Sequence, residues 1–416
     1  MRSIHIVGAG MAGLAAAVRL ANAGQRIILH ESSSHAGGRC RSFHDRTLDC
    51  TIDNGNHLLL SGNRSAETVL EEIGASDTLT GPRDARFSFV DVTNGDRWTV
   101  RLGSGRIPWW ILRADCRPPG TSVIDFLSIL RLSWTDPNTT VASLFEQTGP
   151  LFTRFLEPLA LAALNTPLDR AATAPLWQVF QETILQGGSA CRPMIARDGL
   201  SDSFISPALE HIRGRGATVC FNRRLKRVSF ESEHAVRLEF TDGEIGLSAA
   251  DAIVLAISPT SLGALLPDIP VPQENHAIVN VHFKLPQSPA IISETNILGV
   301  VGGVAEWLFV RGSVISVTIS AADALAELPA AVIVDKVWHD VERAMDISGA
   351  IPPYKVVKER RATFSQTPEA TRARPGTRTN YVNLFLAGDW TNTGLPATIE
   401  SAVRSGHKAA DIILAT

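Results

Sequence analysis

A glycine-rich turn lies between the first apolar strand and the first apolar helix of this sequence. Ile4–Val7 has the composition of a buried strand, and it is followed by G-A-G-M-A-G and then by Leu14–Ala23, whose apolar residues repeat at helical spacing. Such a turn needs one glycine for its tight bend, a second so that a pyrophosphate can approach the backbone, and a third so that the helix can pack on the strand. Gly8, Gly10 and Gly13 meet these needs, which predicts a dinucleotide-binding βαβ unit in an α/β fold.

An acidic residue and a second glycine pair follow this turn. The predicted strand Arg26–His30 ends at Glu31, where a carboxylate can accept hydrogen bonds from both ribose hydroxyls of an adenosine. Gly37 and Gly38 precede Arg39, so backbone amides and a guanidinium are available for more of a phosphate chain. These additions favour a dinucleotide site over an ordinary glycine-rich turn.

The C-terminal region carries a second combination of strand, glycine, acid and helix. Leu384–Ala387 has the pattern of a buried strand and leads to Gly388 and Asp389, whose carboxylate can accept a hydrogen bond from a ribityl hydroxyl. The last helix begins near Pro396–Thr398, where the positive end of its dipole would stabilise negative charge on a reduced flavin. This second predicted contact favours FAD over NAD.

Composition excludes several classes of protein. The chain has 416 residues and a formal net charge of −3 with no run of like charges, which excludes bulk electrostatic binding of nucleic acid. Five scattered cysteines without a C-x-x-C pair predict reduced thiols, no metal site and a cytoplasmic protein, and the first residues lack the features of a secretion signal. The longest apolar stretch, Ile297–Val310, is interrupted by Glu306 and is shorter than the roughly 20 residues of a membrane-spanning helix. We therefore expect any membrane contact to be peripheral.

Several motifs resemble those of one superfamily. The glycine turns, Glu31 and the segment L-A-G-D-W-T at 386–391 resemble the FAD-dependent amine oxidase and phytoene desaturase superfamily. Further segments resemble the squalene-associated FAD-dependent desaturases within it, which are described as hydroxysqualene dehydroxylases. These segments are D-N-G-N-H-L-L-L-S-G-N (53–63), P-W-W-I-L (108–112), E-P-L-A-L-A-A-L-N-T (157–166), A-C-R-P-M-I-A-R-D-G-L (190–200) and V-K-E-R-R-A-T-F (357–364). The resemblance covers nearly the whole chain.

The resemblance implies a fold, a reaction and a set of cofactor contacts. The fold is a Rossmann-like FAD/NAD(P)-binding domain of glutathione-reductase type with an interleaved substrate-binding domain. The reaction is reductive removal of the hydroxyl of hydroxysqualene by hydride from reduced FAD, giving squalene for hopanoid and isoprenoid synthesis. An unidentified flavin reductant and neighbouring squalene-pathway enzymes are the implied partners. The expected FAD contacts are Gly8, Gly10, Met11, Ala12, Gly13, Glu31, Ser32, Gly37, Gly38, Arg39, Asn54, Gly55, Asn56, Val228, Gly388, Asp389, Pro396, Ala397 and Thr398.

The order of the cofactor segments predicts two interleaved domains. Residues 1–65, 190–262 and 355–416 are assigned to a discontinuous FAD-binding domain. The substrate-binding domain is assigned to 66–189, which we expect to be mostly helical, and to 263–354, which we expect to contain strands over His276–Ser320 and a helix around Ala330–Ala344.

Asp53 and His57 are the candidate catalytic residues. They lie four apart in a polar island between Ile52 and three consecutive leucines, where unpaired polar groups would be costly. A desolvated carboxyl or an imidazolium beside the flavin could donate a proton to the leaving hydroxyl. The alternative is that this island only orders a turn next to the cofactor.

A tryptophan-containing apolar segment has two possible roles. Trp109 and Trp110 are followed by residues 122–134, in which Ser122 and Asp125 fit the capping box of a helix that is apolar around most of its circumference. Core packing explains this pattern, and so does a peripheral membrane patch or tunnel mouth, here at the inner face of the cell membrane.

Other functions compatible with the motifs are also considered. An oxidative carotenoid or phytoene-type desaturase would use a similar fold with the opposite direction of hydride transfer. An amine oxidase usually needs an aromatic cage, for which Tyr354 and Tyr381, the two tyrosines of the chain, provide little material. A non-catalytic flavin-binding scaffold for prenyl enzymes is the alternative from another class.

Overall fold

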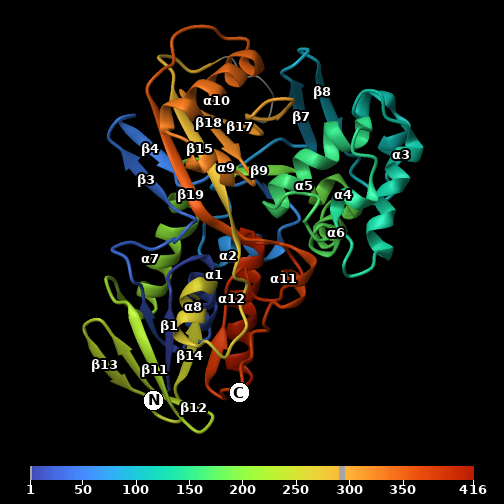
Figure 1. Ribbon diagram of the computed structural model, residues 1–416. Helices are drawn as coiled ribbons and strands as arrows, with labels where there is room; N and C mark the ends of the chain where they lie inside the picture. The colour runs from blue at the N-terminus through green and yellow to red at the C-terminus, as the bar shows by residue number, and fades with distance from the viewer. Residues whose placement is uncertain (1, 290–295) are drawn as a thin grey trace.

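The computed structural model describes residues 2–289 and 296–416, and the chain forms two lobes (Figure 1). The basal lobe contains both chain ends and the predicted dinucleotide unit. The upper lobe contains a large antiparallel-rich sheet with helices on both sides. No helix in the described ranges is both long enough and apolar enough to cross a bilayer.

The basal lobe is built on a five-stranded parallel sheet with β1 at its centre. In spatial order its strands are β10 (Thr218–Cys220), β2 (Arg26–His30), β1 (Ser3–Val7), β14 (Ala252–Leu255) and β20 (Leu384–Leu386). All neighbouring pairs are parallel, which requires these short apolar strands to be covered on both faces.

Different layers cover the two faces of this sheet. One face packs on α1 (Met11–Asn22), α7 (Ser206–Gly214) and α12 (Ile399–Leu414). The other face packs on α8 (Pro259–Leu265) and on an antiparallel sheet. The strands of that antiparallel sheet are β11 (Leu225–Glu231), β12 (His234–Phe240) and β13 (Gly243–Gly246). These layers confirm the predicted α/β fold.

The first turn of helix α1 packs directly against the backbone at the end of strand β1. A Cβ atom added to Gly13 would lie 1.9 Å from the carbonyl oxygen of Gly8, and Gly8 itself has a φ of +105°. Both positions therefore need glycine, Gly13 for close packing and Gly8 for its backbone conformation. Gly10, the N-cap of α1, has no atom within 4 Å of its Cβ position.

The upper lobe is organised by a seven-stranded sheet. In spatial order its strands are β19 (Tyr354–Phe364), β15 (Asn275–Lys284), β18 (Val314–Ile319), β17 (Trp307–Arg311), β16 (Ile297–Val301), β7 (Arg86–Asp91) and β8 (Arg97–Arg101). One face packs on α10 (Ala330–Met345), close to the helix predicted there. The opposite face packs on the helical part of the lobe.

That helical part contains short helices from the first half of the chain. They are α3 (Val123–Leu127), which continues as a 3-10 helix (Ser128–Trp134), α4 (Val141–Leu144), α5 (Glu157–Leu164) and α6 (Thr173–Glu182). Ser122 and Asp125 form the predicted capping box at the start of α3. The stretch 66–189 is nevertheless not purely helical, because β7 and β8 join the large sheet through parallel pairing of β7 with β16.

Two predicted domain boundaries differ from the placement of the elements. The FAD-binding segment was assigned from residue 355, but β19 pairs antiparallel with β15 along its length and belongs to the upper sheet. We therefore propose that the return to the basal lobe occurs after Phe364. The boundary between residues 65 and 66 also needs moving, because it falls inside α2 (Arg64–Glu72), whose buried residues pack with α12 in the basal lobe. We propose that this boundary lies after Glu72.

Replacing Gly13 with alanine should strongly destabilise the basal lobe, because the added Cβ would collide with backbone that cannot move away. We expect the free energy of unfolding to fall by about 3 kcal/mol or more in urea titrations. Gly10→Ala is the matched control. Its Cβ meets open space, so a loss of no more than about 1 kcal/mol is expected. Equal effects of the two substitutions would contradict this account of the turn.

Candidate functional site

The two glycine-rich turns lie side by side at the carboxyl end of β1. The amide of Gly37 donates to the carbonyl of Ala9 over 2.8 Å, and a Cβ on Gly38 would lie 3.6 Å from the Cα of Gly10. The Cβ position of Gly10 faces open space, at the first turn of α1. Amides at a helix N-terminus next to open space are what an anionic phosphate chain requires. The residues therefore fit the pyrophosphate of a dinucleotide.

Glu31 is fixed next to these turns. Its Oε2 accepts from the amide of Ala9 over 2.8 Å, and its Oε1 accepts from the amide of Ser33 over 2.8 Å and from the hydroxyl of Ser32 over 3.1 Å. The carbonyl of Glu31 accepts from the amide of Arg223, just before β11. The carboxylate is thus positioned at the end of β2, where a ribose acceptor is needed.

Three of the expected cofactor residues use their side chains for packing. Met11 and Ala12 begin α1 and are buried between this helix and the sheet. Val228 is buried on β11, paired with Leu238 of β12, in the cluster on the other face of the sheet. A cofactor would contact these residues mainly through their backbone.

Asp389 connects the C-terminal strand to the second glycine turn. It follows Gly388 at the end of β20 and is buried, and its Oδ1 accepts from Nη2 of Arg39 over 2.7 Å. Arg39 also donates to the carbonyl of Ala362. Oδ2 of Asp389 accepts no hydrogen bond from the described residues. It is therefore available to a polar ligand such as a ribityl hydroxyl.

A buried arginine organises the loop after Asp389. Arg374 donates to the carbonyl oxygens of Asp389 over 2.9 Å, Leu395 over 2.7 Å and Trp390 over 3.3 Å, and also to that of Thr391. Burial lowers its pKa to about 10, so it stays charged at neutral pH. Sequence reasoning missed Arg374 because it lies among several arginines and its carbonyl partners are 15 to 21 residues away.

The start of α12 lies beyond this loop. Thr398 is the N-cap and accepts from the amide of Ser401 over 3.2 Å. The amide of Ala397, which follows Pro396, donates to the side chain of Gln366 over 3.3 Å. The positive end of the α12 dipole therefore lies where the sequence placed it.

Asp53, one of the two candidate catalytic residues, is the centre of a buried ion pair. Its Oδ2 accepts from Nη2 of Arg311 over 2.8 Å. Its Oδ1 accepts from the hydroxyl of Ser42 over 2.6 Å and the amide of Leu200 over 3.0 Å. Three donors on two oxygens fix the position of this side chain. The geometry gives Asp53 a positioning role.

The residues after Asp53 join the two lobes through polar contacts. Nδ2 of Asn56 donates to the hydroxyl of Thr318 over 3.0 Å, and that hydroxyl donates to Oδ1 of Asn280 over 2.8 Å. The Cβ position of Gly55 lies 3.3 Å from Nδ2 of Asn280, and the carbonyl of Asn54 accepts from the same nitrogen over 3.5 Å. The predicted flavin segment thus lies against β15 and β18 of the upper sheet.

His57, the other candidate, is neutral at pH 7. Burial lowers its pKa to about 4, against the opposing effect of the Asp53 charge. A neutral imidazole can donate a hydrogen bond, but it is not the imidazolium acid that the sequence hypothesis required.

Glu306 is a half-buried carboxyl whose sequence pattern indicated only an interruption of an apolar stretch. Its Oε2 accepts from the amide of Ser320 over 2.8 Å. Ser320 follows the end of β18, two residues after Thr318 of the polar junction. Burial raises its pKa to about 7, with a smaller contribution from the charge of Glu157. Glu157 is half-buried at the start of α5, and burial raises its pKa too. A lone carboxylate in Ile297–Val310 was the signal that could have identified this group.

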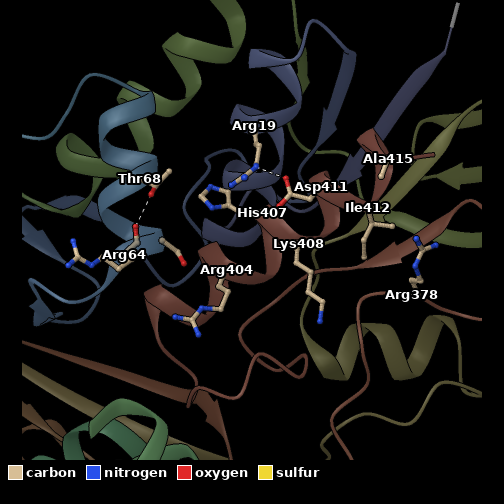
Figure 2. Close-up of a pocket in the computed structure, with 11 residues that line it drawn as sticks. Arg19, Arg64, Thr68, Arg378, Arg404, His407, Lys408, Asp411, Ile412 and Ala415 are labelled. Carbon is tan, nitrogen blue, oxygen red and sulfur yellow. Dashed lines mark hydrogen bonds and ion pairs between the residues drawn. The ribbon is translucent and has the colours of Figure 1, made fainter. Parts of the chain in front are cut away.

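A charged hollow of about 500 Å³ lies elsewhere, on the outer side of α12 (Figure 2). It is lined by Arg19, Arg64, Arg404, His407 and Asp411, among others. Arg19 pairs with Asp411 over 2.7 Å and Arg404 pairs with Glu182 and Glu400. None of the expected cofactor residues lines this hollow, so it is separate from the candidate site.

Comparison with protein families gives one match over nearly the whole chain. The model of the flavin containing amine oxidoreductases matches residues 11–414. Hydroxysqualene dehydroxylases of Sinorhizobium fredii and Rhodopseudomonas palustris are 45% and 43% identical to this chain, covering 99% and 100% of it and 98% and 99% of their own lengths. The 15-cis-phytoene desaturase of Synechococcus elongatus is 26% identical over 99% of this chain and 96% of its own.

Solved structures support the fold. A protoporphyrinogen oxidase described as putative, from Exiguobacterium, has a TM-score of 0.71 at 17% identity and covers 100% of this chain and 99% of its own. Cyclohexylamine oxidase from Brevibacterium oxydans has a TM-score of 0.71 at 15% identity and covers 99% and 98%. At these identities the similarity concerns the fold alone.

Replacing Arg374 with methionine should disorder the loop that carries Asp389, because several buried carbonyls would lose their donor. We expect the free energy of unfolding to fall by about 3 kcal/mol or more. Arg378→Met, a change of an exposed arginine four residues away, is the control and should cost less than about 0.5 kcal/mol. Urea unfolding of both variants, with flavin content measured on the same samples, checks the prediction. A stable Arg374→Met protein with full flavin content would contradict it.

Proposed function

This chain belongs to the flavin containing amine oxidoreductase family, and we propose that it is an FAD-dependent hydroxysqualene dehydroxylase that produces squalene. The observation that carries this conclusion is 43–45% identity over the full chain to three curated hydroxysqualene dehydroxylases. The phytoene and zeta-carotene desaturases that match are only 21–26% identical. Dehydroxylation is therefore favoured over oxidative desaturation.

The residues of the basal lobe support FAD as the flavin. The amides around Gly10 and Gly38 would hold the pyrophosphate, Glu31 would accept from the adenosine ribose, and Asp389 would accept from the ribityl chain. The start of α12 would stabilise charge on the flavin ring. Bound in reduced form, FAD would supply the hydride that replaces the hydroxyl, so the protein must supply the proton that lets hydroxide leave as water.

The upper lobe offers an apolar region suited to a polyisoprene. Aromatic side chains from the sheet, such as Phe89 and Trp307, and from the helical part, such as Phe155, belong to one apolar cluster. An allylic carbon placed between this cluster and the polar junction of Asn56, Asn280 and Thr318 would face the flavin segment. Apolar walls would also exclude water from the reacting carbon.

We assign proton donation to Glu306 in preference to Asp53 or His57. Glu306 accepts from the amide of Ser320, which lies two residues after Thr318 of the polar junction, and it directly precedes Trp307 of the apolar cluster. With a pKa of about 7 it is partly protonated at neutral pH, as a general acid must be. Asp53 holds its segment in place through Arg311, and His57 acts as a neutral neighbour.

The proposed setting follows from the substrate. Hydroxysqualene is a lipid, so we place the protein in the cytoplasm at the inner face of the cell membrane, beside other squalene-pathway enzymes. A separate electron donor would reduce the flavin between turnovers.

Anaerobic turnover of the reduced protein tests the reaction. Photoreduced protein mixed with hydroxysqualene should regain the absorbance of oxidised flavin, and extraction should yield squalene in a stoichiometric amount. Flavin that remains reduced until air enters would contradict dehydroxylation. Loss of flavin absorbance when oxidised protein meets phytoene would instead support the desaturase alternative.

Glu306→Gln should slow flavin reoxidation by hydroxysqualene by about 100-fold or more, because the amide cannot donate the acid proton. In the unmodified protein the rate should fall as the pH rises through about 7, where Glu306 loses its proton, and this fall should vanish in the variant. Stopped-flow absorbance across pH measures both effects.

Glu327→Gln, which changes an exposed carboxyl on the same lobe, is the matched control and should leave the rate unchanged. An unchanged pH profile in Glu306→Gln would show that another group donates the proton. Equal flavin content in the two variants ensures that the rates compare folded, loaded enzymes.

A further inference from the structure

Segment 106–134 exposes large apolar side chains on the outer side of the upper lobe. These residues include Ile107, Trp109, Leu112, Ile124, Leu127 and Trp134. The exposed fractions are 67% for Trp109, 77% for Ile124 and 82% for Trp134. Figure 1 places α3 at the edge of the molecule, away from the basal lobe. A concentration of large apolar side chains in water marks a contact surface.

The helical part of this segment is apolar on two sides. Residues three apart lie on the same side of a 3-10 helix and are neighbours on one face of an α-helix, so α3 and its 3-10 continuation carry apolar stripes. One stripe is buried in the apolar cluster of the upper lobe and consists of Phe126, Ile129 and Leu132. The other is exposed and consists of Ile124, Leu127 and Leu130. The exposed stripe is not part of the apolar core.

The charges of the segment are predominantly positive. It contains four arginines and only two acids, Asp115 and Asp125. Asp115 pairs with Arg113 over 2.7 Å, and Asp125 is used in the capping box of α3. Of the remaining arginines, Arg106 and Arg131 are exposed and form no ion pair with the described residues, whereas two nitrogens of Arg117 are buried and do not face this surface.

We propose that segment 106–134 docks the protein on the surface of an anionic phospholipid bilayer. Exposed tryptophans and aliphatic side chains would enter the headgroup boundary, where indole rings are favoured. Unpaired arginines beside them would meet the phosphates of anionic lipids. The positive charge of the segment favours an anionic lipid surface, because apolar contacts alone would fit any apolar partner.

The inner side of the same segment leads toward the proposed substrate region. The rings of Trp110 and Phe126 lie 5.2 Å apart, and those of Phe126 and Phe155 lie 6.3 Å apart. One short segment therefore separates the bilayer from the apolar cluster. This part of the inference rests on the proposed function, since only a lipid substrate would need that route.

Cosedimentation with vesicles tests the docking surface. The flavin-loaded protein should bind vesicles of phosphatidylcholine and phosphatidylglycerol more tightly than vesicles of phosphatidylcholine alone, and added salt should weaken the difference. The double variant Trp109→Ser, Trp134→Ser should lose binding to both. Arg106→Gln and Arg131→Gln should each weaken binding to the anionic vesicles by about fivefold and leave binding to neutral ones unchanged.

Matched surface changes serve as controls. Val382→Ser removes an exposed apolar side chain from the basal lobe, and Arg213→Gln removes an exposed arginine there; neither should alter binding. Full vesicle binding by the tryptophan variant would overturn the proposal. A tryptophan-dependent dimer in gel filtration without vesicle binding would also overturn it, in favour of a second copy of the chain.

Turnover of detergent-dispersed hydroxysqualene separates this proposal from the proposed function. Protein that converts the dispersed substrate but binds no vesicle would refute the docking surface alone. Protein that binds anionic vesicles through the tryptophans but forms no squalene would refute the proposed reaction alone.

Discussion

The contact between the end of β1 and the first turn of α1 is the constraint on which the basal lobe depends. The missing side chain at Gly13 lets the helix approach the carbonyl of Gly8, and this approach aims the start of α1 at the open space beside Gly10. The sheet then extends on both sides of β1 with strands drawn from the whole chain. The turn that would bind phosphate and the packing contact between β1 and α1 are formed by the same residues. A substitution that changes one therefore changes the other.

Arginines that bind buried carboxylates or carbonyls connect this lobe to the rest of the protein. Arg39 ties the second glycine turn to Asp389, Arg374 holds the loop that follows, and Arg311 reaches Asp53 from the upper sheet. Removing one partner of such a pair would leave a buried charge uncompensated, which is far costlier than losing a surface pair. The arginines therefore fix the relative positions of segments that are distant in sequence, at the place where a flavin would lie between them.

Most large apolar side chains lie in four core clusters, and a smaller group is exposed. Two clusters cover the faces of the basal sheet, one lies under α10, and one lies between the upper sheet and the helical part. The exposed stripe of segment 106–134 belongs to none of these clusters. A carboxyl beside an apolar cluster, such as Glu306, is costly unless it is hydrogen-bonded or protonated, since burial opposes its charged form.

The sequence by itself determined the βαβ unit, the FAD-type motifs, the helix capped by Ser122 and the family resemblance, because these depend on residues close together in the chain. It did not determine that β7, β8 and β19 join one sheet, since strand pairing between distant segments leaves little local pattern. Asp53 and His57 were identified as a polar island, but only the tertiary structure supplied Arg311 as the partner of Asp53 and the burial that keeps His57 neutral. Arg374 and Glu306 became visible for the same reason: a side chain's charge state and partners are set by the groups that folding brings around it.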